Sequence, residues 1–508
     1  MVKFPIGLQD FRSLREEGYL YIDKTEQVYR LIQSSKFFFL SRPRRFGKSL
    51  TVSTLHELYR GNRAVFSGLW VEKYWDWERQ HPIIWLRFAL MDYEQKGLEA
   101  AILEQLATVG KSYQIVLEQQ SAKGAFAELI QKMAAQGQRT VVLIDEYDKP
   151  LVDDLEDTQQ VDARRKVLRS FYSVLKDLDP YLELVFITGV SAFSKVSLFS
   201  ALNNLTNVTL GSRAEDLVGI TEAEIDRYLA PHLGDLSRDD LRRWYNGYSW
   251  TGKVRVYNPF SLLSALYSGE IFNFWFDTGT PNFLIQLLKR AGIYDVGKFL
   301  QVSQHRLTSF DPENIDLASI LFQTGYLTIV DRDEFLGRSF DLDYPNLEVR
   351  ESMQTYLLQS ISPNPDLDAR GRAVLMARAL IRHDLDLFIE HLNALFANIP
   401  YDFWSRDEEF AFHTVLFLLF ELIGVPVETE VHTSKGRADA AVILEHAVYV
   451  FEFKRDQSVA SALKQIRERD YLDKYGGQGR KRYAVGIKFS SKKRSVADWV
   501  VEEVIPNE

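Results

Sequence analysis

The sequence predicts an α/β fold, with a parallel sheet in the N-terminal half of the chain and a second α/β unit near the C-terminus. Short apolar runs alternate with stretches of helical length up to about Ser191, which is typical of βαβ crossovers. A Gly-Lys-Ser loop follows the first apolar run, and an Asp-Glu pair ends a later one. Two more apolar runs, near residues 440 and 450, carry acidic and basic residues.

The first strand is expected at residues 37–40, shortly before a loop that ends in Gly47, Lys48 and Ser49. A loop between a strand and a helix N-terminus presents backbone N–H groups and the positive end of the helix dipole to a phosphate. Lys48 would add charge for the β- and γ-phosphates of ATP or GTP, and Ser49 a hydroxyl for Mg²⁺. Arg42 occupies the position of the usual first glycine, so the loop pattern is incomplete.

A strand that ends in two acidic residues supports a nucleotide site. Residues 141–144 are an apolar run suited to a strand buried on both faces, and Asp145 and Glu146 follow it. We expect Asp145 to hold Mg²⁺ and Glu146 to polarise the water that attacks the γ-phosphate. The alternative is a buried strand followed by a solvated acidic turn, which the Gly-Lys-Ser loop upstream makes less favourable.

Two further strands, at residues 82–88 and 182–191, complete the expected parallel sheet. Thr188 and Ser191 lie at the end of the last strand, where a polar side chain can contact the γ-phosphate or orient water. Capping of the strand end explains both residues equally well. No single arginine stands out as an arginine finger, and the candidates are Arg42, Arg44, Arg45 and Arg213.

Several short blocks between residues 4 and 265 resemble the AAA-ATPase-like family of prokaryotes. The blocks are Phe4–Gly7, Tyr21–Thr25, Arg42–Leu50, Ile144–Pro150, Trp244–Tyr248 and Val256–Ser261. The resemblance implies ATP binding and hydrolysis by a P-loop NTPase whose sheet has an extra strand between the two nucleotide motifs. It also accounts for Arg42, because Arg-Pro-Arg-Arg-Phe-Gly-Lys-Ser is the family's own form of the loop.

The same resemblance implies a set of site residues. Tyr21, Asp23 and Lys24 are candidates for the adenine side, and Ser49 and Asp145 for the Mg²⁺ ion. The candidate ATP contacts are Arg44, Arg45, Phe46, Gly47, Lys48, Ser49, Leu50 and Thr188.

Composition limits the remaining possibilities. The 508 residues, 46% of them hydrophobic, can bury a large core and predict two to four domains. The absence of cysteine excludes disulfides, thiolate zinc sites and cysteine nucleophiles. No apolar run reaches the ~20 residues that span a bilayer, so we expect a cytoplasmic protein with no membrane partner. With a net charge of −9, any nucleic-acid contact requires a local basic patch.

We expect three parts along the chain. Residues 1–230 form the ATPase domain. Residues 231–365 form a helical lid or winged-helix-like region, rich in aromatic residues. The last domain covers residues 366–508, with a core at about 405–495, after a segment rich in Ser, Pro, Asn and Asp.

A second cluster of candidate catalytic residues lies in this last part. Asp439 precedes one expected strand, Glu452 and Lys454 lie in the next, and a short turn would bring them together because residues two apart on a strand share a face. Asp439 and Glu452 would hold Mg²⁺, Lys454 would position water or offset phosphate charge, and Glu409 could add a carboxylate. An exposed charged hairpin or a buried ion pair fits the same residues, although the apolar neighbours of Glu452 argue against a casual surface.

Residues 405–495 resemble the PD-(D/E)XK nuclease superfamily. Gly436–Asp439 and Glu452–Lys454 match its two central motifs, with Ala438 in place of the proline, and Glu409–His413 resembles its first acidic helix. Residues 462–466 resemble the helix on which relatives carry an active-site glutamine, here Gln465. The resemblance implies a restriction-endonuclease-like α/β fold with Asp439, Glu452, Lys454 and Gln465 as catalytic residues and Glu409, Asp439 and Glu452 as Mg²⁺ ligands.

Eight basic residues follow between positions 474 and 494, a range that contains no acidic residue. Such a cluster can neutralise phosphates, so we expect contact with nucleic acid, DNA in the first place; solvated loops are the alternative. The leading hypothesis is an ATPase joined to a Mg²⁺-dependent nuclease under nucleotide control, and a homo-oligomer is compatible with it. The alternative is a nucleotide-gated switch or assembly protein whose C-terminal domain binds nucleic acid or a partner without cutting.

Overall fold

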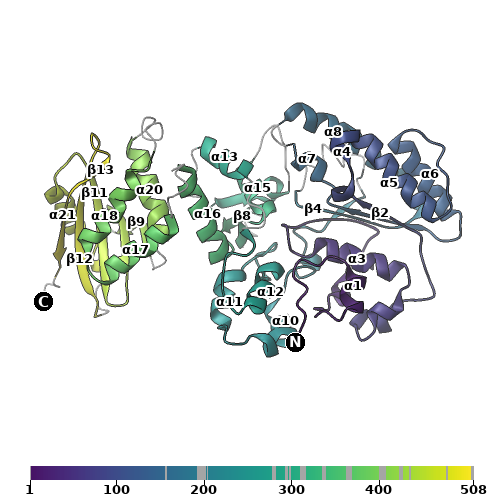
Figure 1. The fold of residues 1–508 in the computed structure, drawn as a ribbon, viewed down its shortest axis with the longest axis horizontal. Helices are drawn as coiled ribbons and strands as arrows, with labels where there is room; N and C mark the ends of the chain where they lie inside the picture. The colour runs from purple at the N-terminus through teal and green to yellow at the C-terminus, as the bar shows by residue number, and fades with distance from the viewer. Residues whose placement is uncertain are drawn as a thin grey trace. The chain divides into compact units, whose positions relative to one another are not determined.

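The computed structural model describes residues 2–154, 157–191, 202, 204–276, 282–291, 296, 299–308, 316–333, 339–361, 369–399, 408–422, 427–433, 436–475 and 479–504 (Figure 1). Within these ranges, the side chains of residues 282–283, 290–291, 369, 408–413 and 427–438 are not described. The chain divides into two compact units, Met1–Thr280 with Val296–Arg350, and Pro281–Asp295 with Glu351–Glu508. The three parts expected from the sequence remain a prediction.

The first unit contains the parallel sheet that the sequence predicts. Its strand order is β2-β3-β4-β1-β5, and every neighbouring pair is parallel. The strands are β1 (Phe37–Ser41), β2 (Ile83–Arg87), β3 (Thr140–Asp145), β4 (Leu182–Gly189) and β5 (Thr206–Asn207). Strand β4 lies between the strand that precedes the Gly-Lys-Ser loop and the strand that ends in Asp145. The extra strand implied by the AAA-ATPase-like resemblance is therefore present.

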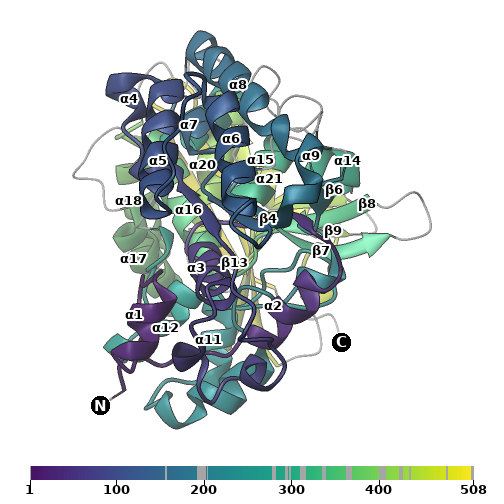
Figure 2. The same ribbon diagram turned by 90° about the vertical axis from the view of Figure 1, so that its right-hand side faces the viewer.

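Helices cover both faces of this sheet (Figures 1 and 2). Helices α1 (Phe11–Glu16) and α3 (Lys48–Tyr59) lie on one side, and α4 to α8 lie on the other. The remaining helices and 3-10 turns of this part are α2 (Thr25–Ile32), η1 (Arg63–Phe66), η2 (Trp70–Lys73), η3 (Phe88–Leu90), α4 (Tyr93–Lys96), α5 (Leu98–Ser112), α6 (Ala122–Ala134), α7 (Lys149–Val152), α8 (Thr158–Tyr172), α9 (Val174–Asp177), η4 (Asp179–Tyr181) and η5 (Ser212–Ala214).

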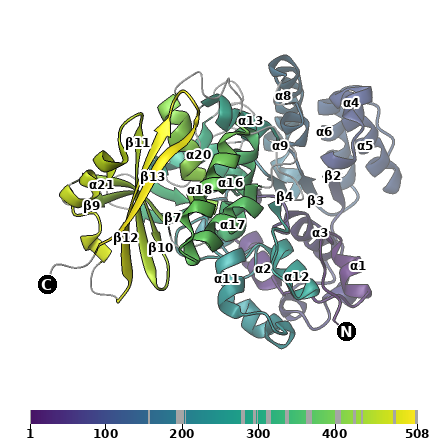
Figure 3. The same ribbon diagram turned by 60° about the vertical axis from the view of Figure 1, so that its left-hand side comes forward.

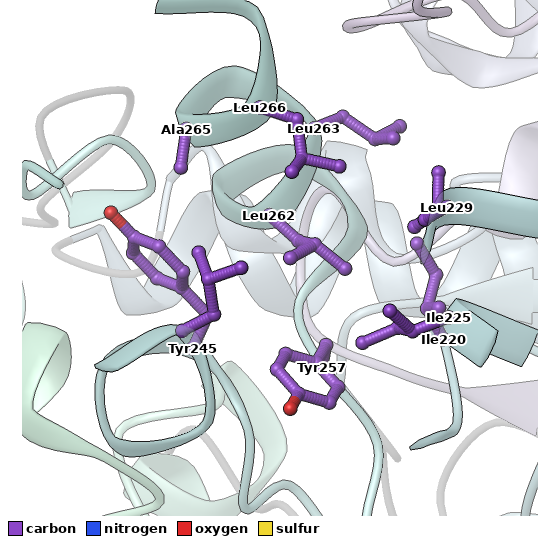
Figure 4. Close-up of a cluster of buried hydrophobic side chains, with 10 residues drawn as sticks. Ile220, Ile225, Leu229, Tyr245, Tyr257, Leu262, Leu263, Ala265 and Leu266 are labelled. Carbon is purple, nitrogen blue, oxygen red and sulfur yellow. The ribbon is translucent and has the colours of Figure 1, made fainter. Parts of the chain in front are cut away.

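A helical region follows the sheet within the same unit. It comprises α10 (Glu222–Glu224), the π-helical turn η6 (Ile225–Leu229), η7 (Ala230–His232), α11 (Arg238–Tyr245) and α12 (Pro259–Ser268). Asn258 caps α12 by accepting the N–H groups of Phe260 and Ser261. Leu262, Tyr245 and Tyr257 meet in its apolar core (Figure 4), and the N-terminal block contributes Phe4 and Ile6 to the rim.

The first unit ends in a small antiparallel sheet of order β6-β8-β7. Its strands are β6 (Phe299–Ser303), β7 (Thr328–Asp333) and β8 (Ser339–Asp343), and the helices α14 (Gln304–Leu307) and α15 (Leu317–Thr324) lie between β6 and β7 along the chain. The winged-helix-like region expected from the sequence remains a prediction.

The second unit contains a five-stranded mixed sheet of order β13-β12-β11-β10-β9, in which only β11 and β12 are parallel. Its strands are β9 (Val427–Thr433), β10 (Gly436–Ile443), β11 (Ala447–Arg455), β12 (Lys481–Ser490) and β13 (Ser495–Glu503). Helix α21 (Val459–Glu468) covers one face, and α17 (Ala369–Ile381), α18 (Leu385–Phe396) and α20 (Glu408–Leu422) cover the other (Figure 3). The unit also contains α13 (Asn282–Ala291) and η9 (Asp473–Tyr475), and α16 (Leu347–Ile361) runs across the division between the units.

Both sheets agree with the predicted α/β fold class. Among the described residues, no helix combines the length and apolar character that crossing a membrane requires.

Candidate functional sites

The loop between β1 and α3, called the phosphate loop below, ends at Gly47 and leads directly into α3. Gly47 precedes the first residue of α3 with φ 93°, in the left-handed region that glycine adopts at little cost. Open space surrounds the position where a Cβ would lie, so its φ angle, and not crowding, favours glycine here. Arg45 also has a positive φ, of 67°. Helix α3 therefore begins at this loop, and the free N–H groups of its first turn can bind an anion there.

Arg42 is a structural brace of the loop. Its guanidinium is buried, donates to the backbone carbonyls of Ser41, Thr209 and Ala214 at 2.8 Å, and lies 4.0 Å from the ring centre of Trp250. Burial lowers the pKa of Arg42 to about 9. A side chain held in this way cannot reach a nucleotide, so Arg42 is not an arginine finger.

The predicted nucleotide contact Phe46 turns its ring away from the loop. The ring is 1% exposed and packs edge-on against Tyr248 at 4.7 Å and Trp250 at 5.5 Å. Only the backbone of Phe46 is left for a phosphate. The exposed Arg44 and Arg45 remain available as cations, with Arg45 5.0 Å from the Phe260 ring.

Residues far along the chain contact the loop between β1 and α3. Trp275 Nε1 donates to the carbonyl of Arg44 at 3.1 Å. Gly325, with φ 91°, packs so closely on the loop that an added Cβ would lie 2.7 Å from Cβ of Pro43. Tyr248, from the Trp244–Tyr248 block, contacts both Phe46 and Trp275, a role that its sequence alone does not reveal.

Lys48 and Ser49 are the first two residues of α3, which follows the carboxyl end of β1. Lys48 is buried and donates to the carbonyl of Pro43 at 2.8 Å, and burial lowers its pKa to about 8. The Ser49 hydroxyl lies close enough to the Asp145 carboxylate to lower the pKa of Asp145, against the larger effect of burial. Leu50 is half-buried one position further along α3. A lysine at the loop and a hydroxyl beside a carboxylate are the groups expected around a Mg²⁺-nucleotide.

The end of β3 places Asp145 and Glu146 beside these residues. Burial, more than the nearby Glu146 charge, raises the pKa of Asp145 to about 6, and its Oδ1 is buried without a hydrogen-bond partner. A bound cation would satisfy such an oxygen, so the site fits Mg²⁺. Glu146 has φ 54°, a strained conformation for a non-glycine residue that is common at functional sites.

The residues after β4 are hydrogen-bonded to the turn after β3. Thr188 is fully buried and donates to the carbonyl of Leu40 on β1 at 2.9 Å, which favours a strand-linking role over contact with a γ-phosphate. Asp148 accepts the N–H groups of Val190 at 3.0 Å and Ser191 at 2.6 Å. No role was predicted for Asp148 from the sequence, although its place in the Ile144–Pro150 block was a signal.

The absence of a side chain at Gly189 allows Asp148 to approach the end of β4. A Cβ at Gly189 would lie 2.3 Å from Oδ1 of Asp148 and 2.6 Å from the Tyr147 ring. The sequence Thr-Gly at the end of β4 is therefore explained by close approach of the Asp148 carboxylate.

The Tyr21–Thr25 block has structural partners. Asp23 accepts the N–H groups of Thr25 at 2.9 Å and Trp70 at 2.7 Å. Lys24 forms a largely buried ion pair with Glu224 at 2.6 Å. These contacts tie the N-terminal segment to η2 and α10, and they account for Asp23 and Lys24 without an adenine.

The second candidate centre lies on the face of the C-terminal sheet that α21 covers. Strands β10 and β11 form the antiparallel pair that the sequence predicts. Alternation along β11 places Glu452 and Lys454 on the same face as Val448 and Val450, which pack against α21. Asp439 lies at the same level on β10, since its Oδ2 accepts the N–H of Phe453 at 2.7 Å.

Lys454 connects the polar groups of this centre. Its Nζ donates to Oε1 of Glu452 at 2.8 Å and to Oε1 of Gln465 at 2.7 Å. Gln465 in turn donates from Nε2 to the Tyr471 hydroxyl at 3.3 Å. The helix that the resemblance indicated thus brings its glutamine into contact with the lysine.

Glu452 is a buried carboxyl group with a shifted pKa. Burial, reinforced by the charge of Asp439, raises the pKa of Glu452 to about 7, and its Oε2 is buried without a hydrogen-bond partner. Two facing carboxylates, one with an unsatisfied buried oxygen, fit a divalent cation. The described residues contain no group of three or more His, Cys, Asp or Glu placed to hold a metal. Glu409 lies in α20, but its side chain is outside the described set.

Fold and sites together define a P-loop-type ATPase domain joined to a domain of the nuclease superfamily. Family comparison agrees: residues 5–199 match the AAA-ATPase-like family, described as predicted AAA-ATPase, and residues 407–499 match the PD-(D/E)XK nuclease superfamily. The chain belongs to the AAA-ATPase-like family and carries a PD-(D/E)XK nuclease superfamily domain at its C-terminal end.

The chain is also similar to individual proteins. An uncharacterized protein in the vnfD 5' region of Azotobacter chroococcum mcd 1 is 40% identical over 515 residues, covering 99% of both chains. The crystal structure of Cdc6p from Pyrobaculum aerophilum matches with a TM-score of 0.24 and 10% identity, over 66% of this chain and 94% of that one.

Proposed function

We propose that this protein binds and hydrolyses ATP at the β1–α3 loop and cleaves nucleic-acid phosphodiesters, DNA in the first place, at the Asp439, Glu452 and Lys454 centre. ATP would control the cleavage. The observation that carries the proposal is the contact of Lys454 with both Glu452 and Gln465, beside Asp439. These side chains come from two strands and a helix. A charged hairpin exposed to solvent would not bring a helix side chain into contact with them.

At the first site, the chain itself supplies the groups that ATP hydrolysis requires. The N–H groups at the start of α3 and the Nζ of Lys48 bind phosphate oxygens. Ser49 and Asp145 would hold Mg²⁺. Glu146 orients water and takes up its proton as the oxygen attacks the γ-phosphorus, and the bond to the β-phosphate oxygen breaks to give ADP and phosphate.

At the second site, Asp439 and Glu452 would hold Mg²⁺, with Glu409 as a further candidate ligand. A bound Mg²⁺ supplies neutralisation of phosphate charge and a more acidic water. Lys454, fixed by Gln465, donates a hydrogen bond to the attacking water or to a phosphate oxygen. The water oxygen forms a bond to phosphorus as one P–O ester bond breaks. The water gives up a proton to solvent, and the leaving oxygen takes one up from solvent.

Cleavage of end-labelled DNA and RNA, with and without Mg²⁺, tests the second site. Lys454→Ala should lose at least 100-fold in rate because a positioned cation disappears from the charged transition state. The matched control is Lys464→Ala, whose side chain is 71% exposed on the same helix as Gln465 and faces Glu468. Cleavage that survives Lys454→Ala would reject the nuclease assignment.

Phosphate release from ATP tests the first site. Lys48→Ala should lose at least 100-fold in rate, because Lys48 is the cation of the phosphate loop. Lys36→Ala is the control, since Lys36 lies at the opposite end of β1 and pairs with Asp179. Unchanged hydrolysis by Lys48→Ala would exclude this loop as the ATP site.

A further inference from the structure

Seven of the eight basic residues between positions 474 and 494 separate into two groups in the structure, and the eighth, Lys474, lies in η9. Arg480, Lys481 and Arg482 lie at the start of β12, far from Lys454 along the sheet. Arg482 is buried and donates to the carbonyl of Leu472 at 3.3 Å. The second group, Lys488 and the turn at 491–494, lies at the other end of β12. Only this second group is close to the candidate metal centre.

Lys488 lies directly beside Lys454. The parallel register of β11 and β12 pairs Lys454 with Lys488 and Glu452 with Gly486, so both lysines are on the face that carries Glu452. Helix α21 covers this face at Gly486, where an added Cβ would lie 2.9 Å from the carbonyl of Val459. Lys488 is two residues further along the strand and half-buried.

Lys488 forms no ion pair within 4.0 Å among the described residues, although the register places Asp498 of β13 opposite it. Asp456 is near enough for Lys488 to contribute to its lowered pKa, which is due first to hydrogen bonding with Ser491. A half-buried ammonium group next to a catalytic centre is well suited to bind an anion that arrives with the substrate.

The turn between β12 and β13 extends this positive surface. Lys492 and Lys493 are both exposed. Asp456, just after β11, holds the turn by accepting the N–H of Ser491 at 3.1 Å and donating its own N–H to the carbonyl of Phe489 at 2.9 Å. The turn is therefore held at the same end of strands β11 and β12 as Lys454 and Lys488.

We propose that Lys488, Lys492 and Lys493 form a track for the phosphate backbone of a nucleic acid that passes the Glu452 centre. Lys488 binds the phosphate next to the scissile one, and the two turn lysines bind phosphates further along the strand. The basic residues at the start of β12 take no part. The inference rests on the proposed nuclease function and adds the direction from which the substrate enters. Phosphate contacts of this kind position a strand without reading its sequence.

Fluorescence anisotropy of the full chain with a fluorescein-labelled 20-base-pair DNA in EDTA tests this track, because cleavage is off without metal. Binding is measured between 50 and 200 mM salt for Lys488→Ala, for Lys492→Ala with Lys493→Ala, and for Lys481→Ala as the matched control. Lys481 is on the same strand, 62% exposed, and 3.5 Å from Glu503. Lys488→Arg retains the charge and serves as the rescue variant.

The Lys488→Ala variant should bind about 5-fold more weakly at 100 mM salt. The slope of log K against log salt should fall by about 0.9, as expected for one lost phosphate contact, and by about 1.8 for the double variant. Lys481→Ala and Lys488→Arg should match the unmodified protein. An unchanged slope for Lys488→Ala, an equal loss for Lys481→Ala, or no DNA binding by the unmodified protein would overturn the track.

The two proposals fail separately. Lys488-dependent binding without Mg²⁺-dependent cleavage would retain the track and reject the nuclease. If cleavage requires Lys454 but DNA binding is unchanged by Lys488→Ala, the nuclease proposal is retained and the track is rejected.

Discussion

Arg42 takes the place of a loop glycine and binds the backbone of its own surroundings. Three carbonyl groups accept its guanidinium protons, and Trp250 covers its face. A guanidinium buried in this way is retained only because all of these partners are present. The departure from the usual loop pattern is thus a fixed part of this form of the loop.

Restoring glycine with Arg42→Gly should therefore harm the protein. The variant loses charge-assisted hydrogen bonds and leaves a cavity, so unfolding should be easier by about 3 kcal/mol. Thermal and urea unfolding measure this change. Unaltered stability, or faster ATP hydrolysis by the variant, would contradict the structural role of Arg42.

Glu452 predicts a metal response that does not require activity. In the absence of nucleotide, Mg²⁺ should raise the melting temperature at pH 8, because an ion that binds only the folded state stabilises it. Glu452→Gln should show a smaller increase, since the unsatisfied Oε2 loses its charge. Equal Mg²⁺-induced increases in both proteins would count against a metal at Glu452.

At the scale of elements, Glu222 connects the helices of the region after the first sheet. Its carboxylate accepts from Arg242 at 2.8 Å, from the Tyr257 hydroxyl at 2.7 Å, and also from Arg238. Burial alone would raise its pKa, but the hydrogen bonds from these residues lower the pKa of Glu222 to about 2. This region holds Tyr248 and Trp250 against the phosphate loop.

The lowered pKa of Glu222 gives a pH dependence of stability. Because the folded pKa is below the unfolded value of 4.5, the contribution is present above about pH 4.5 and is lost as the pH falls towards 2. Glu222→Gln should melt several degrees lower than the unmodified protein at pH 7. The difference should shrink steadily in melting curves below pH 4.5. A difference independent of pH would contradict the ionic role.

Strands β1 to β4 and the loop could be predicted from the sequence, because apolar runs and a Gly-Lys-Ser loop depend on local chemistry. The two-residue strand β5 was not predicted. The hairpin that carries Asp439 and Glu452 was predictable for the same reason. The braces of the phosphate loop were not. Trp275 and Arg44 are 231 positions apart, and no local pattern reports such a contact. The buried ring of Phe46 and the role of Asp148 escaped prediction for this reason too.

At the scale of the whole molecule, the chain contains two candidate phosphate-chemistry sites, one in each compact unit. Each site has a buried carboxylate with an unsatisfied oxygen, Asp145 in the first and Glu452 in the second. Each also has a lysine that is held by neighbouring groups. A protein with both sites can use ATP to control when the second site acts, which is the central claim of the proposed function.

The most direct test measures the rate of Mg²⁺-dependent DNA cleavage with and without ATP, for the unmodified protein and for Lys48→Ala. If ATP controls cleavage, ATP should change the rate of the unmodified protein by at least 10-fold, and Lys48→Ala should give one rate under both conditions. Lys36→Ala should respond to ATP as the unmodified protein does. An unmodified protein that cleaves DNA at the same rate with and without ATP would contradict the claim, and so would a full ATP response in Lys48→Ala.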